Sequence, residues 1–153
     1  MHDTMMSSTI ELRFARTEDI PNASEFVLLA LNDNEMKSEC AEELGSDFAS
    51  HLETYGPQNI LLAIDKNNND TIVGFIEINP ERSIKGQYCI SNLYVLQAYR
   101  NQTITRSLVQ KMLEEKCAPG EELIIQACHE CDLTYWKDLE FTPKSTILSL
   151  KRL

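Results

Sequence analysis

No run of apolar residues in this sequence approaches the roughly 18 that a membrane-spanning helix needs. The first nine residues, MHDTMMSST, also lack the basic region followed by an apolar region that marks a secretory leader. These two absences predict a cytoplasmic protein that makes no use of a membrane. We expect residues 1–8 to form a loosely held tail and residues 9–153 to form one domain, because this length suits a single core.

Basic side chains are scarce, with 14 lysines and arginines against 24 acidic residues and a formal net charge of −10. Such a surface repels nucleic acid and anionic lipid, so neither is an expected partner. It favours a cationic partner such as an amine, although acidic surfaces also serve solubility alone. With 42% apolar and 25% charged residues, the composition is that of a globular protein.

Disulfides are not expected, because the five cysteines are an odd number in a chain without a leader. Cys128 and Cys131 form one Cys-x-x-Cys motif, which is a weak metal signal on its own. A structural zinc site needs four ligands, and Cys117 or His129 would complete the set only with unusual spacing. A small core residue is the simpler interpretation of Cys128. The sequence therefore predicts no metal site.

Apolar patterns predict strands at residues 10–15, 59–65, 71–79, 87–96, 122–128 and 145–150. Helices are predicted after residue 16 and up to residue 31, within residues 35–52 as one or two segments, at 104–117 and at 133–139. For the first helix, Thr17 is the expected cap, and Phe26, Leu29 and Ala30 form the inner face. The three central strands predict an antiparallel meander, and the following helix and strand predict a right-handed parallel crossover.

The junction between the strand 87–96 and the next helix predicts an anion site. Apolar residues change there from strand spacing to helical spacing, as Ile104, Leu108 and Met112 show. The first N–H groups of a helix have no partner within it, and they lie at the positive end of its dipole. Arg100 and Arg106 are close by in sequence, although arginines at a helix start are also common on ordinary surfaces.

Several motifs resemble those of the GNAT superfamily of N-acetyltransferases across nearly the whole chain. The family junction, Leu-x-Val-x-Pro-x-Tyr-Arg-Gly-x-Gly-x-Gly, is similar to LYVLQAYRNQTIT at residues 93–105. Val73-Gly74-Phe75 resembles the central hairpin, RFARTEDI at 13–20 the opening, and YWKDLEF at 135–141 the late Phe-Tyr-x-x-x-Gly-Phe. The resemblance implies an α/β fold whose mixed, mostly antiparallel sheet has helices on both faces. It implies transfer of an acetyl group from acetyl-CoA to a primary amine.

The resemblance also implies a cofactor site. In the family, the strand bulges next to the position of Val95 and separates from the following strand, and the pantetheine arm and acetyl group lie in that gap. The pyrophosphate caps the next helix. The implied cofactor-binding residues are Leu93, Val95, Arg100, Asn101, Gln102, Thr103, Ile104, Thr105 and Arg106, with His129 as a minor candidate.

This sequence departs from the family at positions that carry function, with Gln97 in place of proline and Asn101, Thr103, Thr105 and Glu140 in place of glycine. Glycine lets a phosphate approach the backbone, whereas threonine adds a branched side chain. Two interpretations stay open: a threonine hydroxyl binds phosphate instead, or the loop is only a helix start that Thr103 or Asn101 caps.

The implied mechanism is direct attack of the amine on the thioester. An N–H near Val95 would stabilise the oxyanion, and Glu77 would accept the proton of the amine, directly or through water. A solvent-facing strand position is the simpler interpretation of Glu77. The family tyrosine that protonates the thiolate is Trp136 here, whose indole cannot titrate. Tyr94 is a substitute donor if its ring faces the cleft, whereas Tyr135 is expected to point elsewhere.

Two other functions remain open beside acetyl transfer to a small-molecule or peptide amine. The chain is alternatively a catalytically impaired binding or regulatory module that has lost normal CoA binding, or an acyltransferase for a bulkier acyl group. Residues 21–52 would form the wall of the acceptor pocket, where the family varies most. Pairing is common in the superfamily, so a homodimer is a further option.

Overall fold

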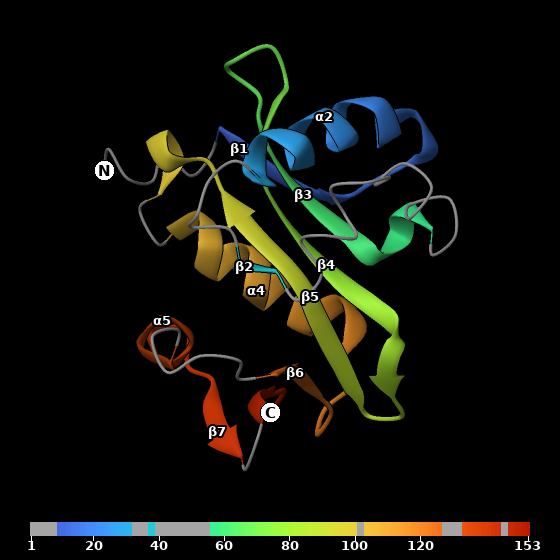
Figure 1. Ribbon diagram of the computed structural model, residues 1–153, viewed down its shortest axis with the longest axis vertical. Coiled ribbons are helices and arrows are strands. Elements are labelled where there is room, and N and C mark those ends of the chain that lie inside the picture. The colour runs from blue at the N-terminus through green and yellow to red at the C-terminus, as the bar shows by residue number, and fades with distance from the viewer. Residues whose placement is uncertain (1–8, 32–36, 39–55, 101–102, 127–132, 145–146) are drawn as a thin grey trace.

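The computed structural model describes residues 9–31, 37–38, 56–100, 103–126, 133–144 and 147–153 (Figure 1). Within these residues, seven strands form a mixed sheet in the order β1-β3-β4-β5-β6-β8-β7, and an eighth, β2, pairs with β5 beside this path. The strands are β1 Ile10–Phe14, β2 Lys37–Ser38, β3 Ile60–Asp65, β4 Thr71–Ile84, β5 Gln87–Val95, β6 Glu122–Gln126, β7 Thr142–Lys144 and β8 Ile147–Lys151. Among the strands that the structure describes, only β5 and β6 pair in parallel, which confirms the predicted meander and the parallel pairing of the strands on either side of the helix.

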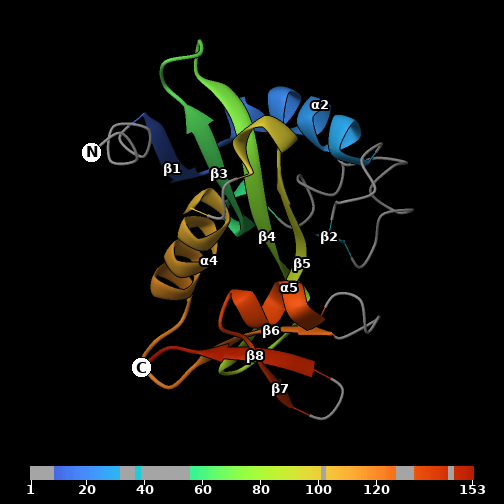
Figure 2. The ribbon, with the colours of Figure 1, turned by 90° about the vertical axis from the view of Figure 1, so that its left-hand side faces the viewer.

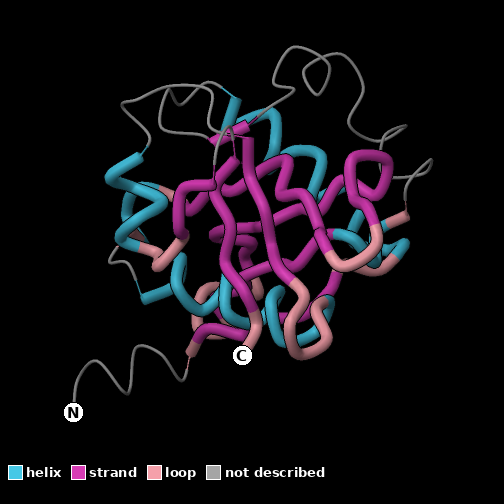
Figure 3. Tube along the Cα trace, turned by 90° about the horizontal axis from the view of Figure 1, so that it is seen from below, coloured by secondary structure: helices cyan, strands magenta, loops and turns pink. Residues whose placement is uncertain are grey.

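Helices cover both faces of the sheet, as the views along and below it show (Figures 2 and 3). They are α2 Ile20–Leu31, α4 Thr103–Lys116 and α5 Leu133–Asp138, with 3₁₀ turns η1 Thr17–Asp19, η2 Pro57–Asn59 and η3 Gln97–Tyr99. One core cluster joins α4 and α5 to the sheet, and a second joins α2 to its other face. All six residues of β3 are buried, because a strand covered on both faces has no solvent side.

The helix start after β1 differs from the prediction that Thr17 is its cap. Thr17 is the first residue of η1, and the N–H of Arg16 donates to Asp19 Oδ2 at 2.8 Å. A carboxylate two residues further along therefore does the capping. The prediction that Leu29 lies on the inner face of α2 is also wrong, since its side chain is 54% exposed, whereas Ala30 is fully buried as predicted.

Other boundaries differ from the prediction as well. Lys37 and Ser38 form β2 within the range 35–52, where helix was expected, and the rest of that range lies outside the described residues. β4 continues to Ile84, beyond its predicted end at Asn79. The short β7 was not predicted, since Thr-Pro-Lys has no apolar alternation.

Replacing Asp19 with asparagine should destabilise the fold by about 1 kcal/mol at neutral pH. Arg13 donates to Asp19 Oδ2 at 2.6 Å and to Oδ1 at 3.0 Å, and this pairing lowers the pKa of Asp19. A lowered carboxyl pKa stabilises the fold above the ordinary value of 3.8, and the effect disappears as pH falls through the folded-state pKa. Urea unfolding at pH 7 and at acidic pH should therefore show a difference from the parent that shrinks in acid.

The matched control is Glu18→Gln, because Glu18 is exposed and lies 3.9 Å from Arg16 in a surface ion pair. Such pairs contribute little to stability. Equal losses in the two variants would contradict a specific role for Asp19.

Candidate active site

The two edges of β5 have different neighbours. One edge pairs with β4, while the other pairs with β6 only at Gln87–Cys89. Further along this second edge, β2 pairs at Asn92 and Leu93. β6 and β8 run across the direction of β5, so the sheet opens beyond the short parallel pairing (Figure 2). Among the strands that the structure describes, none pairs with this edge of β5 at Tyr94 and Val95, and we call this part of the edge open.

The peptide groups of Val95 point into this opening. Leu96 N–H donates to Val73 O at 2.8 Å, while Val95 lies opposite Gly74 in the register. In an antiparallel pair the peptide groups alternate between the two edges, so those of Val95 point away from β4. Arg100 Nε donates to Val95 O at 2.8 Å from that open side.

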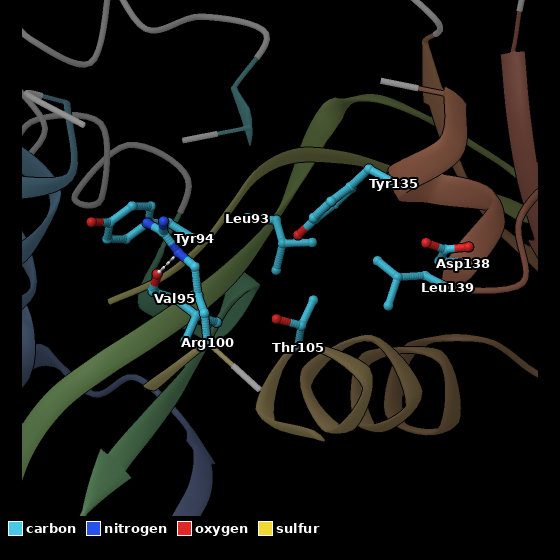
Figure 4. Close-up of a pocket in the computed structure, with 8 residues that line it drawn as sticks. All are labelled: Leu93, Tyr94, Val95, Arg100, Thr105, Tyr135, Asp138 and Leu139. Carbon is cyan, nitrogen blue, oxygen red and sulfur yellow. Dashed lines mark hydrogen bonds between the residues drawn. The ribbon is translucent and has the colours of Figure 1, made fainter. Parts of the chain in front are cut away.

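A pocket of about 170 Å³ lies at this opening (Figure 4). Its walls come from β5, the residue after η3, the first turn of α4 and helix α5. The lining residues are Leu93, Tyr94, Val95, Arg100, Thr105, Tyr135, Asp138 and Leu139. The structure thus brings together five of the residues predicted for the site, and it adds Tyr135 and Asp138 from α5 and Leu139, which directly follows that helix.

Gly74 is needed behind the pocket because the strands and α4 meet closely there. A Cβ at this position would lie 3.1 Å from Tyr94 O and from Val95 Cγ2, and 3.5 Å from Leu108 Cδ1. The absence of a side chain lets β4 support the back of the pocket without displacing Val95.

The Arg100 end of the pocket is positively charged. The guanidinium lies 5.2 Å from the centre of the Tyr94 ring, a distance suited to a cation–π contact. The first turn of α4 contains no acidic residue, and its N–H groups add a partial positive charge. This end is therefore suited to an anionic group.

Tyr99 anchors the turn that precedes Arg100. Its hydroxyl donates to Asp65 Oδ2 at 2.8 Å and accepts from Asn68 Nδ2 at 3.4 Å. The hydrogen bond to Asp65 raises the pKa of Tyr99. Through these bonds η3 is attached to the β3–β4 turn, which positions the loop at the positively charged end of the pocket.

The α4 residues predicted to bind cofactor separate into different environments. Thr105 is buried and lines the pocket, so its branched side chain lies inside the site. Ile104 is buried in the core, whereas Thr103 and Arg106 are exposed and lie outside the pocket lining. Asn101 and Gln102 lie outside the described residues, as do His129 and the Cys128–Cys131 motif.

The expectation that Tyr135 points away from the site is wrong. Tyr135 lines the pocket, and its hydroxyl points toward Leu93 in Figure 4. Trp136, considered for the catalytic position, is 3% exposed, and its ring packs 5.3 Å from that of Phe141. The larger apolar ring occupies the core, and the helical rotation of about 100° per residue turns Tyr135 to the pocket.

The spacing within α5 contains a signal for this arrangement. Trp136 and Leu139 are three residues apart and both are buried, and Tyr135 and Asp138 have the same spacing on the neighbouring face. Once Trp136 and Leu139 are assigned to the core, the helical spacing places Tyr135 and Asp138 together on the neighbouring face, which is the face at the pocket.

Tyr94 forms the opposite wall rather than presenting its phenol to the pocket centre. Its ring packs 5.7 Å from that of Phe26 on α2 and points away from Tyr135 in Figure 4. Tyr135 is therefore the tyrosine whose hydroxyl faces the centre.

Glu77 is not solvent-facing, because it is only 1% exposed. It lies on β4 opposite a bulge, since Glu77 pairs with Asn92 and Ile78 pairs with Ile90, which leaves Ser91 as the extra residue. The bulge is therefore at Ser91, whereas the resemblance implied a bulge next to Val95. Glu77 does not line the described pocket.

Within the described residues, no group of three or more histidine, cysteine, aspartate or glutamate side chains could hold a metal ion. Among the helices that the structure describes, none is both long and apolar enough to cross a membrane.

The family model of the Acetyltransferase (GNAT) family matches residues 19–134. Comparison with curated proteins finds no match. An N-acetyltransferase of Staphylococcus aureus Mu50 is 17% identical, with a TM-score of 0.65, over 92% of this chain and 100% of that one. A GNAT family acetyltransferase of Brucella melitensis, solved with acetyl-CoA, is 19% identical, with a TM-score of 0.64, over 93% and 87%.

A structure from Pyrococcus horikoshii is 22% identical, with a TM-score of 0.61, over 89% of this chain. The chain spans only 44% of the length of that protein. At these identities the structures establish the α/β fold, a mostly antiparallel sheet with flanking helices. The family model covers most of the chain, and this protein belongs to the GNAT acetyltransferase family.

Proposed function

We propose that this protein transfers an acetyl group from acetyl-CoA to a primary amine. The observation that carries the proposal is the pocket in which Tyr135 faces the open edge of β5. Acetyl-CoA would supply the thioester that is attacked. The formal charge of −10 favours a cationic acceptor, such as the amine of a small molecule or a peptide, and disfavours nucleic acid. A cytoplasmic site of action is part of this proposal.

The residues at the pocket suit the successive chemical groups of acetyl-CoA. Arg100 and the first N–H groups of α4 would hold the anionic pyrophosphate. Leu93 and Leu139 would provide apolar walls for the narrow arm. Thr105 has a hydroxyl within the pocket that can donate a hydrogen bond, in place of the close backbone approach that glycine allows.

The chemistry follows from three groups. The amine nitrogen attacks the carbonyl carbon, and the N–H of Val95 donates to the carbonyl oxygen as negative charge develops there. Glu77 accepts a proton from the amine, directly or through water. The carbon–sulfur bond then breaks, and Tyr135 donates a proton to the departing thiolate.

A second candidate is a binding module that no longer takes CoA normally. The observation that favours it is the side chain of Thr105, which occupies pocket space where the family loop has glycine. The two candidates differ in whether acetyl-CoA binds.

Tyr135→Phe should lower kcat by roughly tenfold to a hundredfold, because it removes the proposed acid while keeping the ring. The loss should stay at the low end, since a thiol with an ordinary pKa near 8.5 is a tolerable leaving group. CoA release would be followed with a thiol reagent, using an alkylamine, a polyamine and a lysine peptide as acceptors. Tyr88→Phe is the matched control, since Tyr88 lies on β5 outside the pocket lining. An unchanged kcat in Tyr135→Phe would exclude the proposed acid.

A further inference from the structure

The side-chain amide of Asn92 has one satisfied end and one unsatisfied end. Asn92 is 1% exposed, and its Nδ2 donates to Glu77 Oε1 at 2.5 Å. Ser91 Oγ donates to the same oxygen at 3.2 Å. Asn92 Oδ1 is buried and has no hydrogen-bond partner in the part of the chain that the structure describes. A buried acceptor without a donor is unfavourable and requires a physical explanation.

Rotating the amide cannot satisfy this oxygen. A carboxylate only accepts hydrogen bonds, so a reversed amide would place Asn92 Oδ1 against Glu77 Oε1 and lose the bond from Nδ2. Glu77 thereby determines which end of the amide is left over. The orientation leaves an acceptor beside a carboxylate in a buried position.

Asn92 lies next to the pocket along β5. Asn92 and Tyr94 are two residues apart on the same strand, so their side chains share the α2 face, about 7 Å apart. Leu93 and Tyr94 line the pocket, and Asn92 directly precedes them on the strand. The backbone of β2 passes this point, with Ser38 opposite Asn92 in the register.

We propose that Asn92 Oδ1 accepts a hydrogen bond from the acceptor amine and, with Glu77, makes this site select amines that have at least two N–H donors, such as a primary ammonium. This inference rests on the proposed acetyl transfer. A primary ammonium has three N–H groups. When one proton passes to Glu77, two N–H groups and a lone pair remain. Asn92 holds one N–H, which directs the lone pair toward the thioester carbon.

The count of donors sets the selectivity. An alcohol offers one O–H, which can bond to Glu77 or to Asn92 but not to both. A tetramethylammonium ion has the same charge as a primary ammonium but has no N–H donor. The site should therefore bind n-butylammonium and leave tetramethylammonium unbound, whereas a site that recognised only positive charge would accept both.

The test is an NMR titration of the full-length, ¹⁵N-labelled protein with acetyl-CoA, n-butylammonium and tetramethylammonium. Butylammonium should shift the side-chain amide signal of Asn92, and tetramethylammonium should not. In Asn92→Leu the affinity for butylammonium should fall by about tenfold or more, the effect of one lost hydrogen bond to a charged group. Ser91→Ala is the matched control, because it also removes a bond to Glu77 but keeps Asn92 Oδ1, so its affinity should change by less than about threefold.

The outcomes separate the inference from the proposed function. If acetyl-CoA binds and the two cations shift Asn92 equally, or Asn92→Leu binds butylammonium as the parent does, the inference is overturned while acetyl transfer stands. No shift with butylammonium overturns it as well. Failure of acetyl-CoA to bind overturns both. The comparison of cations uses the parent protein alone, so it remains decisive if Asn92→Leu does not fold.

Discussion

Glu77→Gln should lower kcat/KM by roughly 10²–10⁴-fold, the range observed when a general base is removed. Glutamine has the same shape, and its carbonyl oxygen can still accept from Ser91 Oγ and Asn92 Nδ2. The fold should therefore persist while proton transfer is lost. Steady-state release of the CoA thiol measures the rate, and a melting curve shows whether the variant is folded.

Ser91→Ala is the control for this experiment too, because it weakens the hydrogen bonding of Glu77 without removing the carboxylate. Its kcat/KM should stay within about tenfold of the parent. A folded Glu77→Gln enzyme with parental activity would show that another group accepts the proton.

Trp136→Ala should destabilise the fold by about 3–5 kcal/mol, as expected for removing a buried aromatic side chain. Trp136 is 3% exposed and packs against Tyr135 and Phe141 at ring distances of 5.1 and 5.3 Å. For a domain of this length, the loss corresponds to a fall in Tm of about 10 °C. Urea or thermal unfolding would measure it.

Tyr135→Phe is the stability control for Trp136, since it keeps the ring and changes only the hydroxyl. Its free energy of unfolding should change by less than about 1.5 kcal/mol, while its kcat falls. The opposite result would be a stable Trp136→Ala variant with little activity and a Tyr135→Phe variant with parental activity. It would indicate that residue 136, and not Tyr135, occupies the catalytic position.

The meander of β3, β4 and β5, its parallel pairing with β6 and the pocket walls on β5 could be predicted because they follow from apolar periodicity and from the family junction. Val95, Arg100 and Thr105 are local to that junction, so their meeting depends on few assumptions. Which of the two aromatic residues of α5, Tyr135 or Trp136, faces the site could not be predicted from the motif. Trp136 enters the core in competition with Tyr135, and tertiary packing decides this outcome.

The burial of Glu77 was also beyond the sequence pattern. A strand alternates its faces, and an acidic residue is usually assigned to solvent. Here α2 covers that face, and the bulge at Ser91 brings Ser91 and Asn92 to the same carboxylate. Both depend on contacts between segments far apart in the chain.

The most direct test of acetyl-CoA binding is the melting temperature with and without acetyl-CoA. At a concentration of about 100 times Kd, binding should add roughly 2.7 kcal/mol to stability and raise Tm by several degrees. Arg100→Ala should show a smaller rise at the same concentration, since the positively charged end of the pocket loses its guanidinium. If the Tm of the parent protein does not change at millimolar acetyl-CoA, this result would contradict the proposed acetyltransferase activity and favour a binding module.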